Sequence, residues 1–293
     1  MKNKDAKGMA LVFIAAVLWS TNSILVKSIE LPSILIGAMR ALIAGVVLMP
    51  FIRLKKIKWS LKLLFMMIAF TVQSTCIVIA IKLTSPSIAV GMQFTAPIWL
   101  YLYSRLKGYP FYKRRVIPLA VLSAGVVISM FSKAEGVTML GNIIALSTGV
   151  WFAIVTQLGK ELGGDNPVGM TSINNLFMAL VLLPLFCRDS IPKLFDMDTV
   201  GWITLITLGV VQFGGGYVFY NLGLRYPSAA KAAMISPMEM VLSPVWVAVF
   251  MGEIPDIIGI IGFLVIVAGI GLEVLFTHRY EKAAEAARQE LTS

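Results

Sequence analysis

The chain has 293 residues, of which 58% are hydrophobic and only 14% are charged, and its mean hydropathy is +0.86. This composition is too apolar for a soluble protein of this length and indicates a chain that crosses a membrane several times. The net charge of +10 would suggest nucleic-acid binding in a soluble protein. Here the basic residues lie between apolar blocks, so we interpret them as signals of membrane topology and expect no nucleic-acid partner.

Apolar blocks account for most of the chain. The first block follows a short basic segment but lacks a small-residue cleavage site, so we interpret it as a retained helix and not as a signal peptide. The joins between blocks are short and carry proline, glycine or charge, which leaves no room for a soluble domain. The ten predicted transmembrane helices cover residues 8–26, 33–51, 60–81, 86–104, 115–131, 139–158, 167–187, 199–224, 228–250 and 256–276.

Lysine and arginine are distributed unevenly over the joins. With the N-terminus in the cytoplasm, the segments on the cytoplasmic side carry 18 of these residues and the segments on the other side carry 5. Basic residues are enriched on the cytoplasmic side of membrane proteins. We therefore predict an even number of helices in the cell (inner) membrane, with both termini in the cytoplasm.

The two halves of the chain repeat weakly. Trp19 in the first block corresponds to Trp151 in the sixth, and Lys27 corresponds to Lys160. Five helices per copy is an odd number, so the second copy has to be inverted in the membrane, a recurrent design of secondary transporters. The predicted units are a first repeat at 1–133, a second repeat at 134–276 and a cytoplasmic tail at 277–293.

Several motifs give the chain a resemblance to a known family. They are Leu18-Trp19-Ser20 with Asn22 in the first block, the run from Arg40 to Gly45 in the second, and Gly252-Glu253 after the ninth. With these motifs, residues 8–276 resemble the EamA-type ten-helix members of the drug/metabolite transporter superfamily. The sequence departs from the family pattern at Met240, where many members have proline, at Tyr109, where glutamate is usual, and at Lys231.

The resemblance implies a secondary transporter that works by alternating access around a central cavity. Helices three, four, eight and nine would enclose the substrate, while helices one and six rock around it. The partners would be a small-molecule substrate and the lipid bilayer, with protons as a candidate coupling ion, and the chain would be a monomer or a homodimer. The resemblance implies no cofactor and favours export, but it leaves the substrate class open.

Glu239 is the strongest single candidate for a functional residue. It is the eleventh of the 22 mostly apolar residues from Ala229 to Phe250, which places it near the middle of a helix that spans the bilayer. A carboxylate at that depth costs about 2.5 to 3.5 kcal/mol or more unless it faces protein, water or ligand. Glu239 can bind an ammonium group or carry a proton, and the alternative is a structural carboxylate bonded to a neighbouring helix.

Two cations also lie within apolar blocks. Arg40 in the middle of the second block needs a carboxylate or several carbonyls, so a role in helix packing competes with contact to the substrate. Lys231 lies eight positions before Glu239, about 12 Å along the helix, and is too far away to pair with it. Lys231 can meet an anionic group of the substrate or extend its ammonium group to the membrane interface.

Polar amides and aromatic residues complete the set of candidates. Amides inside membrane helices either bond neighbouring helices or line a polar pathway, and tryptophans away from the helix ends can wall a cavity and bind cations. The glycine triplet before Tyr217 permits a close helix contact or an unwound turn. The predicted substrate-binding residues are Glu239, Gln73, Gln93, Gln212, Trp19, Trp151, Asn22, Tyr217, Lys231 and Arg40.

Missing motifs exclude other classes of protein. The sequence has no phosphate-binding loop and no metalloprotease or serine-hydrolase motif, and its single histidine, His278, lies in the tail. Cys76 and Cys187 lie in separate apolar blocks and imply neither a disulfide framework nor a metal pair. We expect a transporter of a small zwitterionic or cationic metabolite, such as an amino acid or amine. The alternatives are a transporter of an anionic or sugar-linked metabolite and, on weaker grounds, an intramembrane enzyme.

Overall fold

All regular secondary structure in the described part of the chain is helical. The computed structural model describes residues 2–57, 59–108, 116–133, 136–162, 166–223 and 238–292. Seven helices in these ranges are long and apolar enough to cross a membrane, and shorter apolar helices accompany them. The prediction of an all-α protein with several membrane spans is therefore confirmed, while the count of ten spans and the inversion of the second half stay predictions.

The helices follow the predicted blocks closely, although three blocks are interrupted. The first block divides into two helices, the fourth also divides into two, and the eighth contains a π-helical segment. The ninth block is described only from Met238 onward. The helices are α1 Lys2–Ser20, α2 Asn22–Lys27, α3 Ser33–Leu48, α4 Leu61–Leu83, α5 Pro86–Gln93, α6 Ala96–Leu106, α7 Val116–Met130, α8 Met139–Leu162, α9 Pro167–Phe186, α10 Thr199–Thr207, the π-helix Leu208–Gly215, α11 Gly216–Gly223, α13 Met238–Met251 and α14 Ile257–Thr292.

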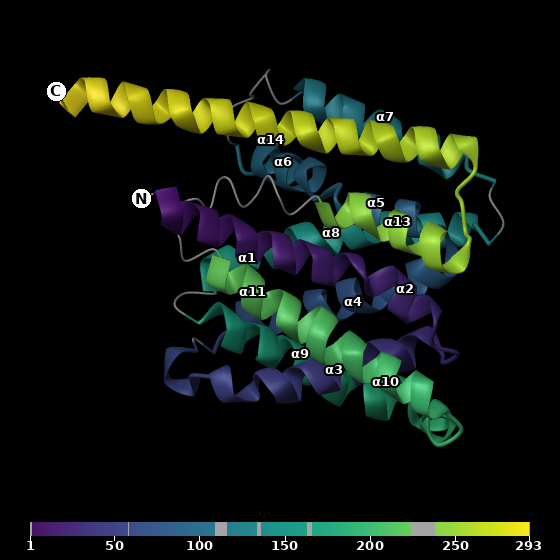
Figure 1. Cartoon of the computed structure of the whole chain (residues 1–293). Helices are drawn as coiled ribbons and strands as arrows, with labels where there is room; N and C mark the ends of the chain where they lie inside the picture. Colours follow the sequence, from purple (N-terminus) through teal and green to yellow (C-terminus); the bar gives the residue numbers. More distant parts are fainter. Residues whose placement is uncertain are drawn as a thin grey trace.

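The helices lie side by side, with α7 and α14 at one edge of the molecule and α3 and α10 at the other (Figure 1). Both chain ends lie at the same end of this bundle. The join between α3 and α4, which contains Arg53, Lys55 and Lys56, lies at that end as well. The join that follows Lys27 and the join that contains Arg188 lie at the opposite end. The α14 helix continues to Thr292, so the backbone shows no break at the predicted start of the tail.

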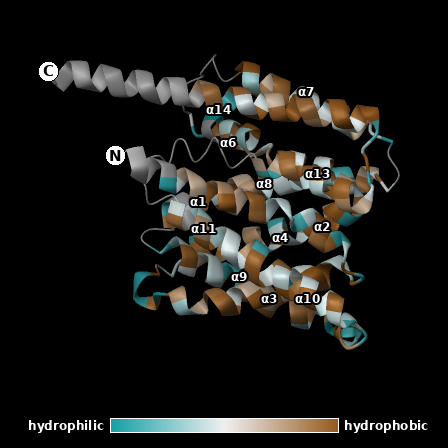
Figure 2. Cartoon of the chain, viewed as in Figure 1, coloured by the Kyte–Doolittle hydropathy of each residue, from teal (hydrophilic) through white to brown (hydrophobic). Residues whose placement is uncertain are grey.

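The outer surface of the bundle is apolar, as a lipid environment requires. Hydrophobic residues cover most of the helices, and hydrophilic residues gather at the joins (Figure 2). Large side chains such as Leu180, Val249 and Phe65 are exposed on the helix surfaces. In the most apolar part of the α14 span, only 28% is buried inside the protein. These exposed faces are suited to contact with acyl chains.

Helices from the two halves of the chain pack against each other to form one shared core. The largest contacts between the halves are those of α7 with α14, of α4 with α8, of α3 with α9 and of α1 with α11. Small residues allow the backbones to approach closely, as is typical of membrane helices. The α3 helix buries Ala41, Ala44 and Gly45, and the Ser172 hydroxyl donates a 2.7 Å hydrogen bond to the Gly45 carbonyl oxygen.

The glycine triplet makes the close helix contact that its sequence permits, and it forms part of a π-helical segment in place of an unwound turn. Gly214 and Gly215 belong to the π-helix, a local widening of the helix that often marks a functional site. Gly216 packs against the Trp19 indole so closely that a Cβ atom at this position would overlap the ring. The side chain of Trp19 is therefore held against the backbone where α11 begins.

The contact between Gly216 and Trp19 gives a direct test of this packing. Gly216→Ala should lower the melting temperature of the detergent-purified protein, because overpacking typically costs about 1 to 3 kcal/mol. The matched control is Gly271→Ala, a helical position where an added Cβ meets nothing within 4 Å. That substitution should leave the melting temperature unchanged or raise it slightly, since alanine is the better helix former. Equal melting temperatures for the two variants would contradict the packing described above.

Candidate functional site

A cavity of about 430 Å³ lies between helices from both halves of the chain. Its wall is formed by α1 to α5, α8, α9, the π-helix, α11 and α13. Of the ten predicted site residues, eight belong to this wall: Trp19, Asn22, Arg40, Gln73, Gln93, Gln212, Tyr217 and Glu239.

Interrupted helices bring several of these residues to the cavity. The hydroxyls of Ser20 and Thr21 donate 2.7 Å hydrogen bonds to the carbonyl oxygens three residues earlier, and the first helix breaks at this point. Asn22 begins the next helix directly after the break. Irregular backbone at membrane depth is tolerated where it is buried in protein or lines a cavity, and the position of Asn22 satisfies that condition.

The break in the fourth block places Gln93. Gln93 is the last residue of α5, and α6 begins three residues later. The Thr95 hydroxyl donates a 2.7 Å bond to the Met92 carbonyl oxygen, and Pro97 lacks the N–H that would continue the helix. Gln212 is placed by the third irregularity, because it lies within the π-helix. Each of the three interruptions therefore presents a polar side chain to the same cavity.

Arg40 is the most deeply buried polar group of the cavity wall, with 1% of its surface exposed. Its Nη1 donates to Asn22 Oδ1 at 2.9 Å, and its Nη2 donates to the backbone oxygen and the hydroxyl of Ser74 at 3.0 and 2.7 Å. The guanidinium also lies 4.8 Å from the centre of the Phe213 ring. Arg40 thus joins α2, α3, α4 and the π-helix, and within the described residues it forms no ion pair.

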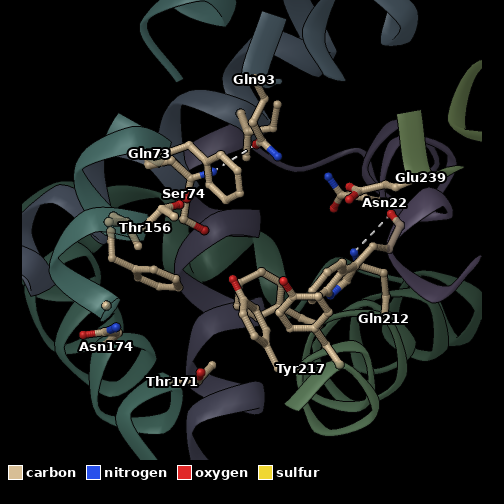
Figure 3. Close-up of a pocket in the computed structure, with 18 of the residues that line it drawn as sticks. Asn22, Gln73, Ser74, Gln93, Thr156, Thr171, Asn174, Gln212, Tyr217 and Glu239 are labelled. Carbon is tan, nitrogen blue, oxygen red and sulfur yellow. Dashed lines mark hydrogen bonds between the residues drawn. The ribbon is translucent and has the colours of Figure 1, made fainter. Parts of the chain in front are cut away.

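The three glutamines that we expected to line a pathway all belong to the cavity wall. Gln73 Nε2 donates to Gln93 Oε1 at 3.0 Å, and Gln212 Nε2 donates to the Trp19 backbone oxygen at 3.4 Å. The two interpretations of these amides, as bonds between helices and as polar lining, therefore describe the same side chains. In Figure 3, Gln73 and Gln93 lie on one side of the cavity, and Gln212, Asn22 and Glu239 lie on the other.

Aromatic rings form a continuous wall along the cavity. The Trp19 ring lies 5.1 Å from the rings of both Tyr217 and Tyr220, measured between ring centroids, and Phe213 lies 5.3 Å from Tyr217. All four residues line the cavity. Their ring faces offer both apolar contact and attraction to a cation.

Glu239 is the acidic residue of the cavity wall. It is the second residue of α13 and is half-buried. Within the described residues the Glu239 carboxylate forms no hydrogen bond and no ion pair. The structural alternative, in which a neighbouring helix holds this carboxylate by a hydrogen bond, therefore receives no support from those residues.

Of the two remaining predicted site residues, one lies outside the cavity wall and the other is not among the described residues. Trp151 is not part of the wall; on α8 the wall contains Phe152, Val155, Thr156 and Gly159 instead. Successive helix residues point about 100° apart, so Phe152 and Trp151 face different directions, and the weak repeat did not reveal which of them faces inward. Lys231 lies outside the described residues.

The sequence-based prediction missed several residues of the wall, and helical spacing would have found some of them. Phe70 precedes Gln73 by three positions, and Tyr220 follows Tyr217 by three. Residues three or four apart share a helix face, so a polar residue that lines a cavity identifies its neighbours on that face. Thr156 and Thr171 lack such a signal, because small hydroxyls are common throughout membrane helices. Asn174 also lines the cavity.

Comparison with known proteins identifies relatives over most of the chain. An uncharacterized transporter of Archaeoglobus fulgidus is 23% identical over 90% of this chain and 94% of its own length. The threonine/homoserine exporter RhtA of Escherichia coli K12 is 22% identical over 74% of each chain. The uncharacterized transporter YxxF of Bacillus subtilis is 25% identical over 64% of this chain, and the match spans 61% of that relative.

A solved crystal structure supports the fold. It aligns with a TM-score of 0.62 over 92% of this chain and 98% of its own, at 17% identity. The model of the EamA-like transporter family matches the chain twice, over residues 6–131 and 139–275. The relatives and the family are transporters and not enzymes. With a cavity built from both matched halves, this chain belongs to the EamA-like transporter family.

Proposed function

We propose that this transporter moves a small zwitterionic or cationic metabolite, an amino acid or an amine, by alternating access. The observation that carries the proposal is the Glu239 carboxylate in the cavity wall, which has no hydrogen-bond or ion-pair partner among the described residues. A carboxylate at this depth is costly unless a cation, a proton or water compensates it. A substrate ammonium group provides that compensation.

The charges of the cavity wall support a zwitterion in particular. Glu239 and Arg40 are the only charged residues among the described residues that line the cavity. Their formal charges cancel, which matches a substrate that carries one charge of each sign. The aromatic wall adds apolar contact for the carbon skeleton and a favourable surface for an ammonium group.

The direction of transport is proposed from the relatives. The RhtA proteins of Escherichia coli and of Salmonella typhimurium are named threonine/homoserine exporters. At 22% identity these names favour export of an amino acid by this chain, without identifying which one.

We also propose that the protein lies in the cell (inner) membrane with both termini in the cytoplasm. The support is the excess of basic residues on one side together with the position of both chain ends at one end of the bundle (Figure 1). Alternating access then requires the opposite end to open and close. Three contacts link α1 or α2 to α13 or to the join that follows it, and they lie toward that end. They are the Lys27–Glu253 ion pair, the 2.8 Å bond between the Ser23 and Ser243 hydroxyls, and the 2.8 Å bond from Trp246 Nε1 to the Ser20 hydroxyl.

Topology can be tested by labelling. A reporter fused after Ser293 should be active only as a cytoplasmic reporter. Single cysteines introduced at Lys133 or Pro192, in a background without Cys76 and Cys187, should react with a membrane-impermeant maleimide from outside intact cells. A C-terminus on the outside would contradict both the proposed orientation and the even number of helices.

The Lys27–Glu253 pair should help to close the outer end. We expect Lys27→Glu to speed the outside labelling of a Ser23→Cys background by up to about fivefold, because a partly exposed ion pair contributes about 0.2 to 1 kcal/mol. Lys27→Glu combined with Glu253→Lys should restore the slow rate. Lys62→Glu, which disrupts the exposed Lys62–Glu161 pair, is the matched control and should leave the rate unchanged. Unchanged labelling in Lys27→Glu would show that the ion pair does not hold this end closed.

Glu239→Gln tests the proposed function directly. The parent protein, purified in detergent, is first screened for thermal stabilisation by the standard amino acids and their decarboxylated amines. Stabilisation by anionic metabolites alone would count against the proposal.

The variant is then compared with the parent. In proteoliposomes, uptake of the best ligand by the parent should depend on pH. Glu239→Gln should fold normally but bind this ligand at least about tenfold more weakly, since hydrogen bonds to charged groups contribute about 1.5 to 3 kcal/mol. Glu161→Gln removes an exposed carboxylate outside the cavity and should behave like the parent. Parent-like uptake by Glu239→Gln at every pH would make Glu239 a structural residue.

A further inference from the structure

We propose that Asn22 recognises the carboxylate group of the substrate, and that Arg40 is a positioning residue which fixes the Asn22 amide in the orientation this requires. The inference rests on the proposed function, because it assumes that the ammonium group of the substrate lies at Glu239. Asn22 would bind the carboxylate group of the substrate, and this contact would allow the protein to distinguish an amino acid from an amine.

Arg40 fixes the orientation of the Asn22 amide. Arg40 Nη1 donates to Asn22 Oδ1 at 2.9 Å. A guanidinium has only donors, so the amide oxygen must face it, and a flipped amide would place donor against donor. The two ends of an asparagine side chain are usually hard to distinguish, but here the chemistry of the partner decides between them. The Asn22 NH2 group therefore points away from Arg40.

The Asn22 NH2 group has no acceptor among the described residues around it. Asn22 is 93% buried, since 7% of its surface is exposed, and it belongs to the cavity wall. Within the described residues, no acceptor is bonded to Asn22 Nδ2. An anionic group in the cavity would supply the acceptor that this donor lacks. Asn22 and Glu239 lie on the same side of the cavity (Figure 3).

Glu239 and Asn22 together match the two charged groups of an α-amino acid. Glu239 offers only acceptors to the cavity, and Asn22 offers donors from the same side. An α-amino acid carries a donor group and an acceptor group on one carbon atom, so a single small molecule can satisfy both side chains. An amine satisfies Glu239 alone and leaves the Asn22 donors without a partner. Loss of a required hydrogen bond discriminates strongly between otherwise similar ligands.

Arg40 acts through Asn22 and not by contact with the substrate. Its surface is 1% exposed, and its Nη atoms are bonded to Asn22 and Ser74. Its positive charge lies behind the amide, where it favours an anion on the cavity side. The loss of the bond between Arg40 and Asn22 should therefore weaken binding of the amino acid more than binding of the amine.

The experiment compares two ligands that differ only by the carboxylate. The probes are the best amino acid from the thermal screen and its decarboxylated amine; for threonine, the amine is 1-amino-2-propanol. Asn22→Asp keeps an acceptor for Arg40 but has no N–H to donate. In full-length purified protein, we expect Asn22→Asp to weaken amino acid binding by at least about tenfold without weakening amine binding.

Three further variants separate this role from other effects. Asn174→Asp makes the same chemical change elsewhere in the cavity wall, away from the Arg40 bond, and its effect on the ratio of the two affinities should be smaller. Asn22→Ala removes the donor without adding charge and should shift the ratio in the same direction as Asn22→Asp. Arg40→Lys, which loses the guanidinium that orients the amide, should also shift this ratio, whereas a purely structural role would lower both affinities equally.

The possible results distinguish a failure of this inference from a failure of the proposed function. An unchanged ratio of affinities in Asn22→Asp or Asn22→Ala, with Glu239→Gln still defective, overturns this inference and leaves the proposed function intact. Failure of both Asn22 variants to fold would assign Asn22 a structural role and would also overturn it. A parent protein that binds amines but no amino acid would overturn the inference and restrict the proposed function to cations. A parent that binds neither would contradict the proposed function itself.

Discussion

The buried guanidinium of Arg40 is the interaction on which the centre of this protein depends. A charge inside the bilayer is costly unless other groups compensate it, and Arg40 draws partners for both of its Nη atoms from different elements. Its Nε is buried and has no hydrogen-bond partner among the described residues. Asn22 and Ser74 accept its hydrogen bonds, and the Phe213 ring lies against it. The helices that carry these residues are thereby held at fixed positions around the cavity. The cost of burying the charge is offset by an arrangement that also defines the site.

The same rule explains why the backbone is irregular where it is. In lipid, an interrupted helix would leave N–H and C=O groups without partners, so breaks are confined to places covered by protein or facing a polar cavity. The breaks before Asn22 and after Gln93, and the π-helix that contains Gln212, all lie at the cavity. Local side chains satisfy part of the freed backbone, as the hydroxyls of Ser20 and Thr21 do. Irregular backbone is therefore one way in which this chain presents polar side chains at membrane depth.

The two halves of the chain share one core, and this arrangement suits a transporter. Contacts between α4 and α8, and between α3 and α9, cross from one matched family region to the other. No single half encloses the cavity, because its wall alternates between them. A rearrangement of one half relative to the other would therefore change access to the site. The polar contacts from α1 and α2 to α13 are weak enough individually to break and re-form during such a change.

Sequence alone determined the helical class, the approximate helix boundaries and the membrane setting, because burial in lipid imposes hydrophobicity over whole segments. It also identified Glu239 and Arg40, since charges in apolar segments stand out against that requirement. The helix breaks were harder to locate, because Pro97 indicates a kink or a full interruption equally well until its neighbours are known. Only the tertiary structure revealed that Arg40 bonds to Asn22 and Ser74, which lie 18 and 34 positions away. It also placed Phe152 and not Trp151 at the cavity. The physical reason is that hydropathy records how much of a helix faces lipid, whereas the inward-facing residues and their partners depend on how each helix is rotated against its neighbours.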